Sequence, residues 1–129
     1  MIIGIGTDII DIRRIEKVIN RFGDKFKKKC FSKDEIIKSD NVFNSTNSYA
    51  KKYAAKEACS KALGTGFFRG VYKKDIEILN SIYGKPIIIL HNEALNKFKK
   101  ISKFECSIAV SISDEKNYAV ANVIIFKKC

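Results

Sequence analysis

The sequence predicts an α+β fold in which a mainly antiparallel sheet packs against one long helix, within a single domain that covers residues 1–129. Short isoleucine-rich segments bounded by Gly, Asn and Asp are typical of strands. One stretch, 46–63, is rich in Ala and Lys and contains no Gly or Pro, which favours a helix. With 129 residues and 46% apolar content the chain can enclose one core, and no repeat or linker divides it.

The N-terminus is predicted to form a strand followed by a helix. An apolar run over 2–10 indicates a buried strand in which Asp8 is the only charge. From residue 11 the apolar side chains recur at helical spacing, and the helix is expected to end at Gly23. Its other face is basic and carries Arg13, Arg14, Lys17 and Arg21.

Two more helices are expected before the middle of the chain. After a lysine cluster at 27–29, Ser32 and Glu35 have the spacing of a capping box that begins a short helix. The Asn- and Ser-rich segment 40–48 then leads into the long helix, for which Gly64 stands at the C-cap position.

The C-terminal half is predicted to be mainly strand. Three glycines from Gly64 to Gly70 mark a loop that could approach a ligand closely. Alternating apolar residues and turn residues then indicate, in order, a strand at 75–79, a turn at 83–86, a strand at 87–90, a helix at 93–101, and a hairpin of 106–112 and 118–126 joined at 114–117.

The charge and the cysteines limit the classes of function. A formal net charge of +11 should attract an anionic partner, which could be nucleic acid, an acidic protein or a phosphorylated small molecule. The four cysteines are widely spaced and the chain has a single histidine, a pattern that does not fit a zinc site. The thiols are therefore expected to be reduced. With no secretory leader or membrane-spanning segment, we expect a globular protein in the cytoplasm.

Asp8 is the first candidate for chemistry. Gly4 and Gly6 lack the third glycine of a dinucleotide fingerprint, and the chain contains no P-loop motif. A carboxylate in a buried strand needs a cation, either a basic side chain or a metal. The structural alternative is that Asp8 or Asp11 merely caps the following helix.

The long helix supplies the second group of candidates. Tyr53, Glu57, Lys61 and Gly64 fall on one helical face, and small alanines surround them. An ordinary solvated pair of Glu57 with Lys61 would explain this spacing. A carboxylate here and another on the first strand could instead hold Mg²⁺, with phosphate oxygens of a substrate as further ligands.

Five short motifs occur along the chain in an order that can be compared with known families. They are Gly4-Ile-Gly-Thr-Asp8, Tyr53-Ala-Ala-Lys-Glu57-Ala with Lys61-Ala-Leu-Gly-Thr-Gly66, Gly84-Lys-Pro86, Val110-Ser-Ile-Ser113 and Tyr118-Ala. In this order and spacing the chain resembles the holo-acyl-carrier-protein synthase family over nearly its whole length. The Lys-Glu-Ala helix and its continuation are specific, whereas Gly-Lys-Pro alone is weak.

The resemblance implies an activity. Members of the family transfer the 4′-phosphopantetheine arm of coenzyme A to a serine of acyl carrier protein, release adenosine 3′,5′-bisphosphate and need Mg²⁺. They serve fatty acid biosynthesis and are usually homotrimers with active sites between adjacent subunits. The acidic carrier protein docks on a basic first helix, which here implies Arg13, Arg14, Lys17 and Arg21.

The resemblance also implies roles for individual residues. Asp8 and Glu57 would bind the metal, and together with Lys61 they would form the catalytic centre. The residues expected to contact coenzyme A are Lys52, Lys56, Lys61, Gly64, Thr65 and Gly66. The proton of the serine would pass to Glu57, to a metal-bound water or to a nearby Asp such as Asp34. His91 is expected at a helix N-terminus on the surface instead.

One position departs from the family. Where many members place a histidine after Val110-Ser-Ile-Ser113, this chain has Asp114 and Glu115, which would repel a phosphate. Two other functions therefore stay in view. A nucleic-acid-binding domain would explain the charge but neither Asp8 nor Glu57, and an inactive relative could bind the carrier protein without transfer.

Overall fold

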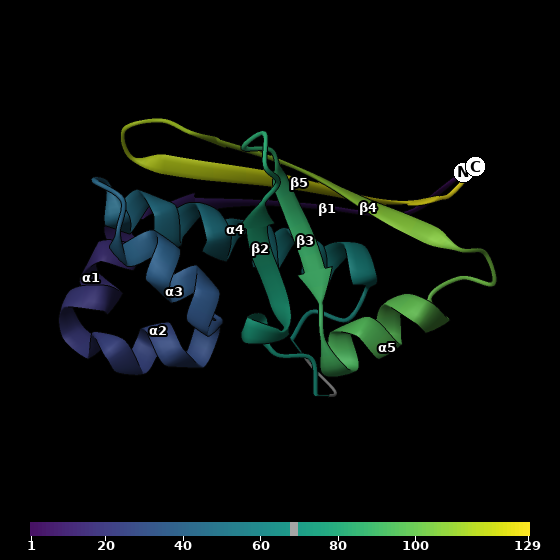
Figure 1. The fold of residues 1–129 in the computed structure, drawn as a ribbon, viewed down its shortest axis with the longest axis horizontal. Helices are drawn as coiled ribbons and strands as arrows, with labels where there is room; N and C mark the ends of the chain where they lie inside the picture. Colours follow the sequence, from purple (N-terminus) through teal and green to yellow (C-terminus); the bar gives the residue numbers. More distant parts are fainter. Residues whose placement is uncertain (68–69) are drawn as a thin grey trace.

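The structure is a computed structural model that describes residues 1–67 and 70–129. A three-stranded antiparallel sheet of order β1-β5-β4 covers the long helix α4, and a two-stranded hairpin of β2 and β3 stands beside them (Figure 1). The strands are β1 (Ile2–Asp11), β2 (Ile76–Asn80), β3 (Pro86–Leu90), β4 (Cys106–Asp114) and β5 (Tyr118–Lys127). The α-helices are α1 (Ile12–Phe22), α2 (Asp24–Cys30), α3 (Lys33–Asp40), α4 (Ser45–Leu63) and α5 (Asn92–Lys100), and η1 (Lys73–Asp75) is a 3-10 turn.

The α+β class and the antiparallel pairing are confirmed, with two corrections. The strands form two sheets rather than one, and α4 is the longest of five α-helices in the described ranges, one more than the sequence predicts. The lysine cluster at 27–29, for which no helix or strand was predicted, lies in α2. Lysine is a good helix former, and Phe26 and Cys30 turn this short helix toward the core.

Local sequence signals set the helix boundaries. Asp11 accepts a hydrogen bond from the Arg13 N–H at the start of α1, and Ser32 and Glu35 form the expected capping box of α3. Gly64 ends α4 in the left-handed conformation, with φ of 79°. None of the helices in the described part of the chain is long and apolar enough to cross a membrane.

β1 crosses α4 at backbone distance. A Cβ atom added at Gly6 would overlap the carbonyl oxygen of Ala58, and one at Gly4 would overlap that of Ala62. Both alanines are buried. Only glycine on the strand and small residues on the helix allow this approach, so the register of β1 against α4 is fixed by sterics.

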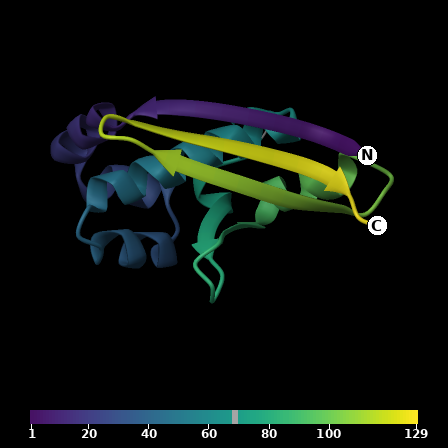
Figure 2. The same ribbon diagram turned by 90° about the horizontal axis from the view of Figure 1, so that it is seen from above.

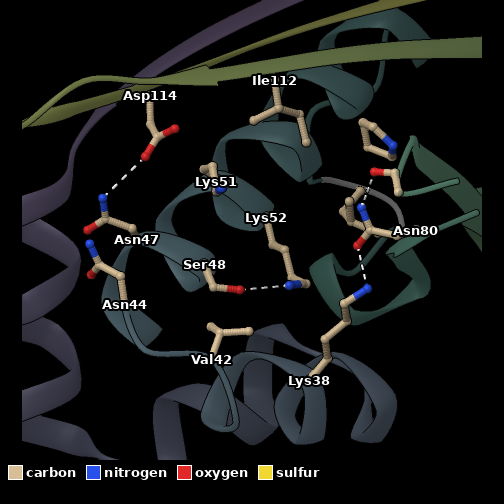
Figure 3. Close-up of a pocket in the computed structure, with 13 residues that line it drawn as sticks. Lys38, Val42, Asn44, Asn47, Ser48, Lys51, Lys52, Asn80, Ile112 and Asp114 are labelled. Atoms are coloured by element: carbon tan, nitrogen blue, oxygen red, sulfur yellow. Dashed lines mark hydrogen bonds between the residues drawn. The ribbon is translucent and has the colours of Figure 1, made fainter.

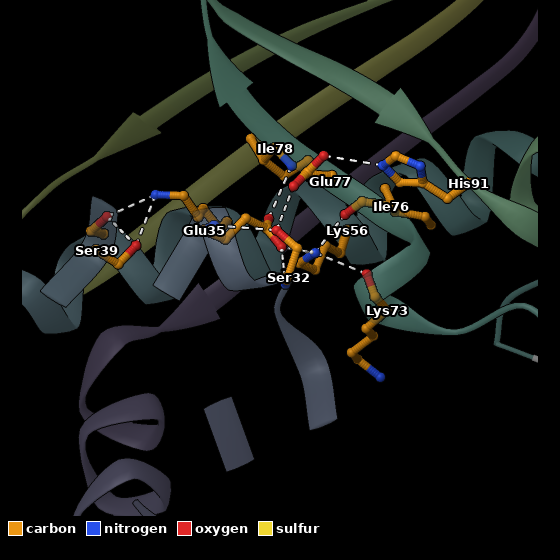
Figure 4. A network of polar contacts seen from close by, with 11 residues as sticks. Ser32, Glu35, Ser39, Lys56, Lys73, Ile76, Glu77, Ile78 and His91 are labelled. Atoms are coloured by element: carbon orange, nitrogen blue, oxygen red, sulfur yellow. Dashed lines mark hydrogen bonds and ion pairs between the residues drawn. The ribbon is translucent and has the colours of Figure 1, made fainter. Parts of the chain in front are cut away.

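A buried ion pair joins three elements on the other side of α4 (Figure 4). Lys56 and Glu35 are both fully buried, with Nζ 2.8 Å from Oε1. Lys56 also donates hydrogen bonds to the carbonyl oxygens of Lys73 and Ile76, and Glu35 accepts from the N–H groups of Ser32 and Ile78. Because the charges are paired and every donor is used, this network holds α3, α4 and the start of β2 together.

We expect Gly6→Ala to destabilise the protein by about 3 kcal/mol or more, because the added methyl meets backbone that cannot move without displacing α4. The exposed neighbouring substitution Thr7→Ala should cost less than about 1 kcal/mol. Urea unfolding of both variants measures the difference, and equal midpoints would contradict the close crossing.

Candidate active site

Asp8 lies on β1 two residues beyond the crossing, with its side chain 18% exposed. The Lys61 ammonium on α4 donates to the Thr7 carbonyl oxygen at 2.8 Å and to Asp8 Oδ1 at 3.2 Å. Asp11, not Asp8, caps α1. Of the two interpretations offered by the sequence, the structure therefore supports the one in which the Asp8 carboxylate faces a cation.

Glu57 pairs with a residue far from it in the sequence. Its Oε1 lies 3.5 Å from Nζ of Lys73 at the start of η1. The simple pair of Glu57 with Lys61, one turn apart on α4, is replaced by two longer-range pairs, Asp8 with Lys61 and Glu57 with Lys73. Each candidate metal ligand thus has an ammonium beside it.

The negative charges of Glu57 and Asp8 both act on the phenol of Tyr53. Burial, with the negative charges of Glu57 and Asp8 as smaller causes, raises the pKa of its phenol to about 12. Tyr53 stays protonated at neutral pH and is a hydrogen-bond donor rather than a base.

The carboxylates suit a hard divalent cation. Their donor atoms are oxygen only, which is the ligand type that Mg²⁺ prefers, and Mg²⁺ commonly uses one or two carboxylates plus phosphate oxygens. Both side chains are partly exposed, at 18% for Asp8 and 26% for Glu57, so a cation and a phosphate could reach them from solvent. The residues present therefore fit the metal expected from the sequence.

A pocket of about 490 Å³ opens on the side of α4 that carries Lys52 (Figure 3). Asn47, Ser48, Lys51 and Lys52 line it from α4. The remaining lining residues come from α3, the β2–β3 hairpin, β4 and the loop before α4; they are Lys38, Val42, Asn44, Ile78, Asn80, Gly84, Pro86, Ile112 and Asp114. Ammonium and amide groups in one pocket suit an anionic, hydrogen-bonding ligand such as a nucleotide phosphate.

Lys52 is the buried cation of this pocket. Its Nζ donates to the hydroxyl oxygens of Ser39 and Ser48, both at 2.9 Å. Burial lowers its pKa to about 8. Two hydroxyl groups do not balance the charge of an ammonium, so an anion in the pocket would stabilise the protonated form.

Lys56 is a correction to the expected coenzyme contacts. Its side chain is fully buried, and its ammonium donates three hydrogen bonds, one to Glu35 and two to carbonyl oxygens. The sequence could not separate it from Lys52 and Lys61, because all three are lysines on one helix. Lys56 stabilises the fold and has no donor left for a ligand.

The glycine loop does not share the pocket of Lys52. Gly64 and Thr65 line a different pocket of about 700 Å³, which α5 closes with Asn96 and Lys97 among others. Gly66 has a positive φ of 56°, and Thr65 donates to its carbonyl oxygen. Within one chain, Lys52 therefore lines one pocket, and Gly64 and Thr65 line another.

The basic residues of α1 and His91 also have clear positions. Arg13, Arg14 and Lys17 line a shallow groove on α1, and Arg21 is exposed at its end. His91 is the exposed N-cap residue of α5, as expected, with Nε2 3.1 Å from Glu77 Oε1.

The positions of Asp114, which departs from the family pattern, and of Asp34, a candidate proton acceptor, are also defined. Asp114 lies on the wall of the Lys52 pocket and accepts a hydrogen bond from Asn47. Asp34 lies exposed in the first turn of α3.

Sequence reasoning missed Lys73 and the serines around Lys52. Lys73 lies in a Lys-Lys pair before a strand, which indicates only a charged turn. Ser39 and Ser48 are separated by nine residues and meet only because α3 folds back on α4. No local pattern in the sequence marks such long-range contacts.

Comparison with known proteins agrees with this geometry. Residues 4–123 match the family model described as the 4′-phosphopantetheinyl transferase superfamily. The chain is 50% identical over 127 residues to a holo-[acyl-carrier-protein] synthase of Agrobacterium fabrum, covering 97% of this chain and 95% of that protein.

Solved structures match as well. The crystal structure of holo-[acyl-carrier-protein] synthase from Neisseria meningitidis has a TM-score of 0.87 at 34% identity, covering 98% of this chain and 100% of that one. An enzyme of the same name from Helicobacter pylori, solved in complex with coenzyme A, has a TM-score of 0.81 at 35% identity, with 95% and 99% covered. The chain therefore belongs to the 4′-phosphopantetheinyl transferase superfamily and, within it, to the holo-[acyl-carrier-protein] synthase family.

Proposed function

We propose that this chain transfers the 4′-phosphopantetheine group of coenzyme A to a serine of an apo acyl carrier protein, using Mg²⁺ held by Asp8 and Glu57. The observation that carries the proposal is the pair of partly exposed carboxylates on β1 and α4, each beside a lysine ammonium. We also propose that the holo carrier serves fatty acid biosynthesis in the cytoplasm.

The cationic groups suit a pyrophosphate substrate. A bound Mg²⁺ would withdraw charge from the phosphate oxygens and stabilise the leaving adenosine 3′,5′-bisphosphate. Lys61 is 53% exposed, and its ammonium, held between Thr7 and Asp8, is free to add a contact to the same phosphates. Lys52 would bind a second phosphate in its own pocket.

The attacking serine must lose a proton as it reaches phosphorus. Glu57 is a candidate acceptor because its carboxylate is partly exposed and lies at the proposed metal site. A water on the metal and Asp34 remain the alternatives. The transfer breaks the P–O bond to the nucleotide and forms a P–O bond to the serine oxygen. Apart from accepting the proton, the residues of the protein position the reactants and neutralise the charge of the phosphates.

We propose further that the chain acts as a homotrimer with the active site between subunits. Lys52 and Lys61 are nine residues apart on α4, about two and a half turns, so they face opposite sides of the helix. One large substrate cannot readily contact both within a single chain. A neighbouring copy that supplies one of the two faces would complete the site.

The open face of the three-stranded sheet is suited to that assembly. In Figure 2 β1, β5 and β4 lie side by side with the helices behind them. Ile5 and Ile9 on β1 are about two-thirds exposed, at 68% and 66%. Around the hydrogen-bonded pair of Thr7 and Asn122 they form an apolar surface of the kind that subunit interfaces bury.

Glu57→Ala should reduce the transfer rate at least about 100-fold while the fold is retained, because the change removes a metal ligand rather than a core group. The measurement is the intact mass of apo acyl carrier protein after incubation with coenzyme A and Mg²⁺, with EDTA as a second negative control. Glu105→Ala, a change at a carboxylate 81% exposed on the surface, is the matched control and should transfer normally. Unchanged transfer by Glu57→Ala would refute the site.

A double reversal, Arg14→Glu with Arg21→Glu, should raise KM for the carrier protein about tenfold and leave KM for coenzyme A unchanged. The reason is that an acidic partner is steered by exposed charges on α1, an effect that salt screens. The same two-site reversal at the exposed residues Lys99 and Lys103, away from α1 and from both pockets, is the control. Equal losses for both substrates would contradict docking on α1.

The affinity for adenosine 3′,5′-bisphosphate should fall about tenfold between pH 7 and pH 9. Lys52 binds an anion in its charged form, which predominates below its pKa of about 8 and is lost above it. Isothermal titration calorimetry should show this fall for the wild type and a flatter profile for Lys52→Met. If both proteins have the same pH profile, Lys52 is not the titrating contact.

A further inference from the structure

Lys73 is a cation at the proposed metal site to which the transfer reaction gives no role. Its Nζ lies 3.5 Å from Glu57 Oε1, and the two side chains are only 22% and 26% exposed. The same ammonium lies 4.0 Å from the ring centroid of Phe67 and 5.4 Å from that of Tyr53. A carboxylate and two aromatic faces therefore surround it, each of which attracts a cation.

The backbone of Lys73 is anchored by the buried ion pair of the fold. Lys56 donates a hydrogen bond to the Lys73 carbonyl oxygen at 2.8 Å, and Lys56 is itself held by Glu35 (Figure 4). The next turn of backbone is fixed by the hydrogen bond from Asp75 N–H to the Tyr72 carbonyl oxygen. Because these hydrogen bonds fix the backbone of Lys73, its side chain extends from a fixed point beside Glu57.

This placement has a consequence for the binding of a divalent cation. A metal ion that takes Glu57 as a ligand must approach an oxygen already paired with an ammonium. It either displaces that ammonium or accepts a positive charge close by, and both lower its affinity. The aromatic faces of Phe67 and Tyr53 offer the displaced ammonium a position close to where it started.

We propose that Lys73 pairs with Glu57 in the metal-free protein and competes with the divalent cation for this carboxylate. The inference rests on the proposed function, because it requires Glu57 to be a metal ligand. Lys73 thereby raises the concentration of the divalent cation that is needed to load the site.

The test measures Mn²⁺ binding to the whole protein without coenzyme A, from the electron paramagnetic resonance signal of free Mn²⁺. Lys73→Met should lower the dissociation constant two- to fivefold, the range expected when one partly exposed ion pair no longer opposes binding. The adjacent Lys74→Met is the matched control. It removes the same charge from an exposed side chain that pairs with no acidic group in the described ranges, and should leave the constant unchanged. Lys73→Arg, which keeps the charge, should leave the dissociation constant at the wild-type value.

A second background separates this inference from the function on which it rests. Glu57→Gln should weaken Mn²⁺ binding, and Lys73→Met added to it should bring no further gain in affinity. If Glu57→Gln leaves Mn²⁺ binding unchanged, the proposed metal site is wrong. If Glu57→Gln weakens binding but Lys73→Met behaves like Lys74→Met, the site stands and the role of Lys73 is wrong. Circular dichroism of each variant in EDTA confirms that these comparisons are between folded proteins.

Discussion

The close crossing of β1 over α4 is the constraint on which the rest of the structure depends. Gly4 and Gly6 meet the helix backbone with no side chain between them, so the strand can lie on α4 in one register only. Asp8, two residues further along β1, is thereby carried to Lys61, and Glu57 lies one helical turn before Lys61. A glycine pair that looks like part of a nucleotide motif therefore acts by shape, because it brings the strand carboxylate Asp8 to Lys61 on α4.

The lysines of α4 show how one residue type serves three purposes on one helix. Lys56 is fully buried in an ion pair and belongs to the framework. Lys52 is nearly buried, held only by hydroxyl groups, and faces a polar pocket. Lys61 is half-exposed beside Asp8. Since an uncompensated buried ammonium is costly, the number and kind of partners each lysine has indicate what it does: Lys56 is satisfied, whereas Lys52 and Lys61 can still gain from an anion.

Much of the fold could be predicted from the sequence, because its signals are local. The capping box at Ser32 and Glu35, the end of α4 at Gly64 and the alternation in β4 and β5 each depend on residues near one another in the chain. The carboxylates Asp8 and Glu57 could also be selected, since charges amid apolar or small residues need partners. The partners themselves could not, because Lys73 and Lys56 differ only in what the tertiary structure packs around them. The second sheet and the separation of Lys52 from the glycine loop likewise arise from long-range packing.

In the proposed function, β1 and α4 together build one metal site from Asp8 and Glu57. The most direct measurement is anomalous X-ray diffraction from crystals of the protein grown with Mn²⁺ and coenzyme A. We expect an anomalous peak within coordination distance of a carboxylate oxygen of Asp8 and of Glu57, with a phosphate oxygen of the substrate as a further ligand. A peak that touches neither carboxylate, or a bound coenzyme whose phosphates lie away from both, would contradict it.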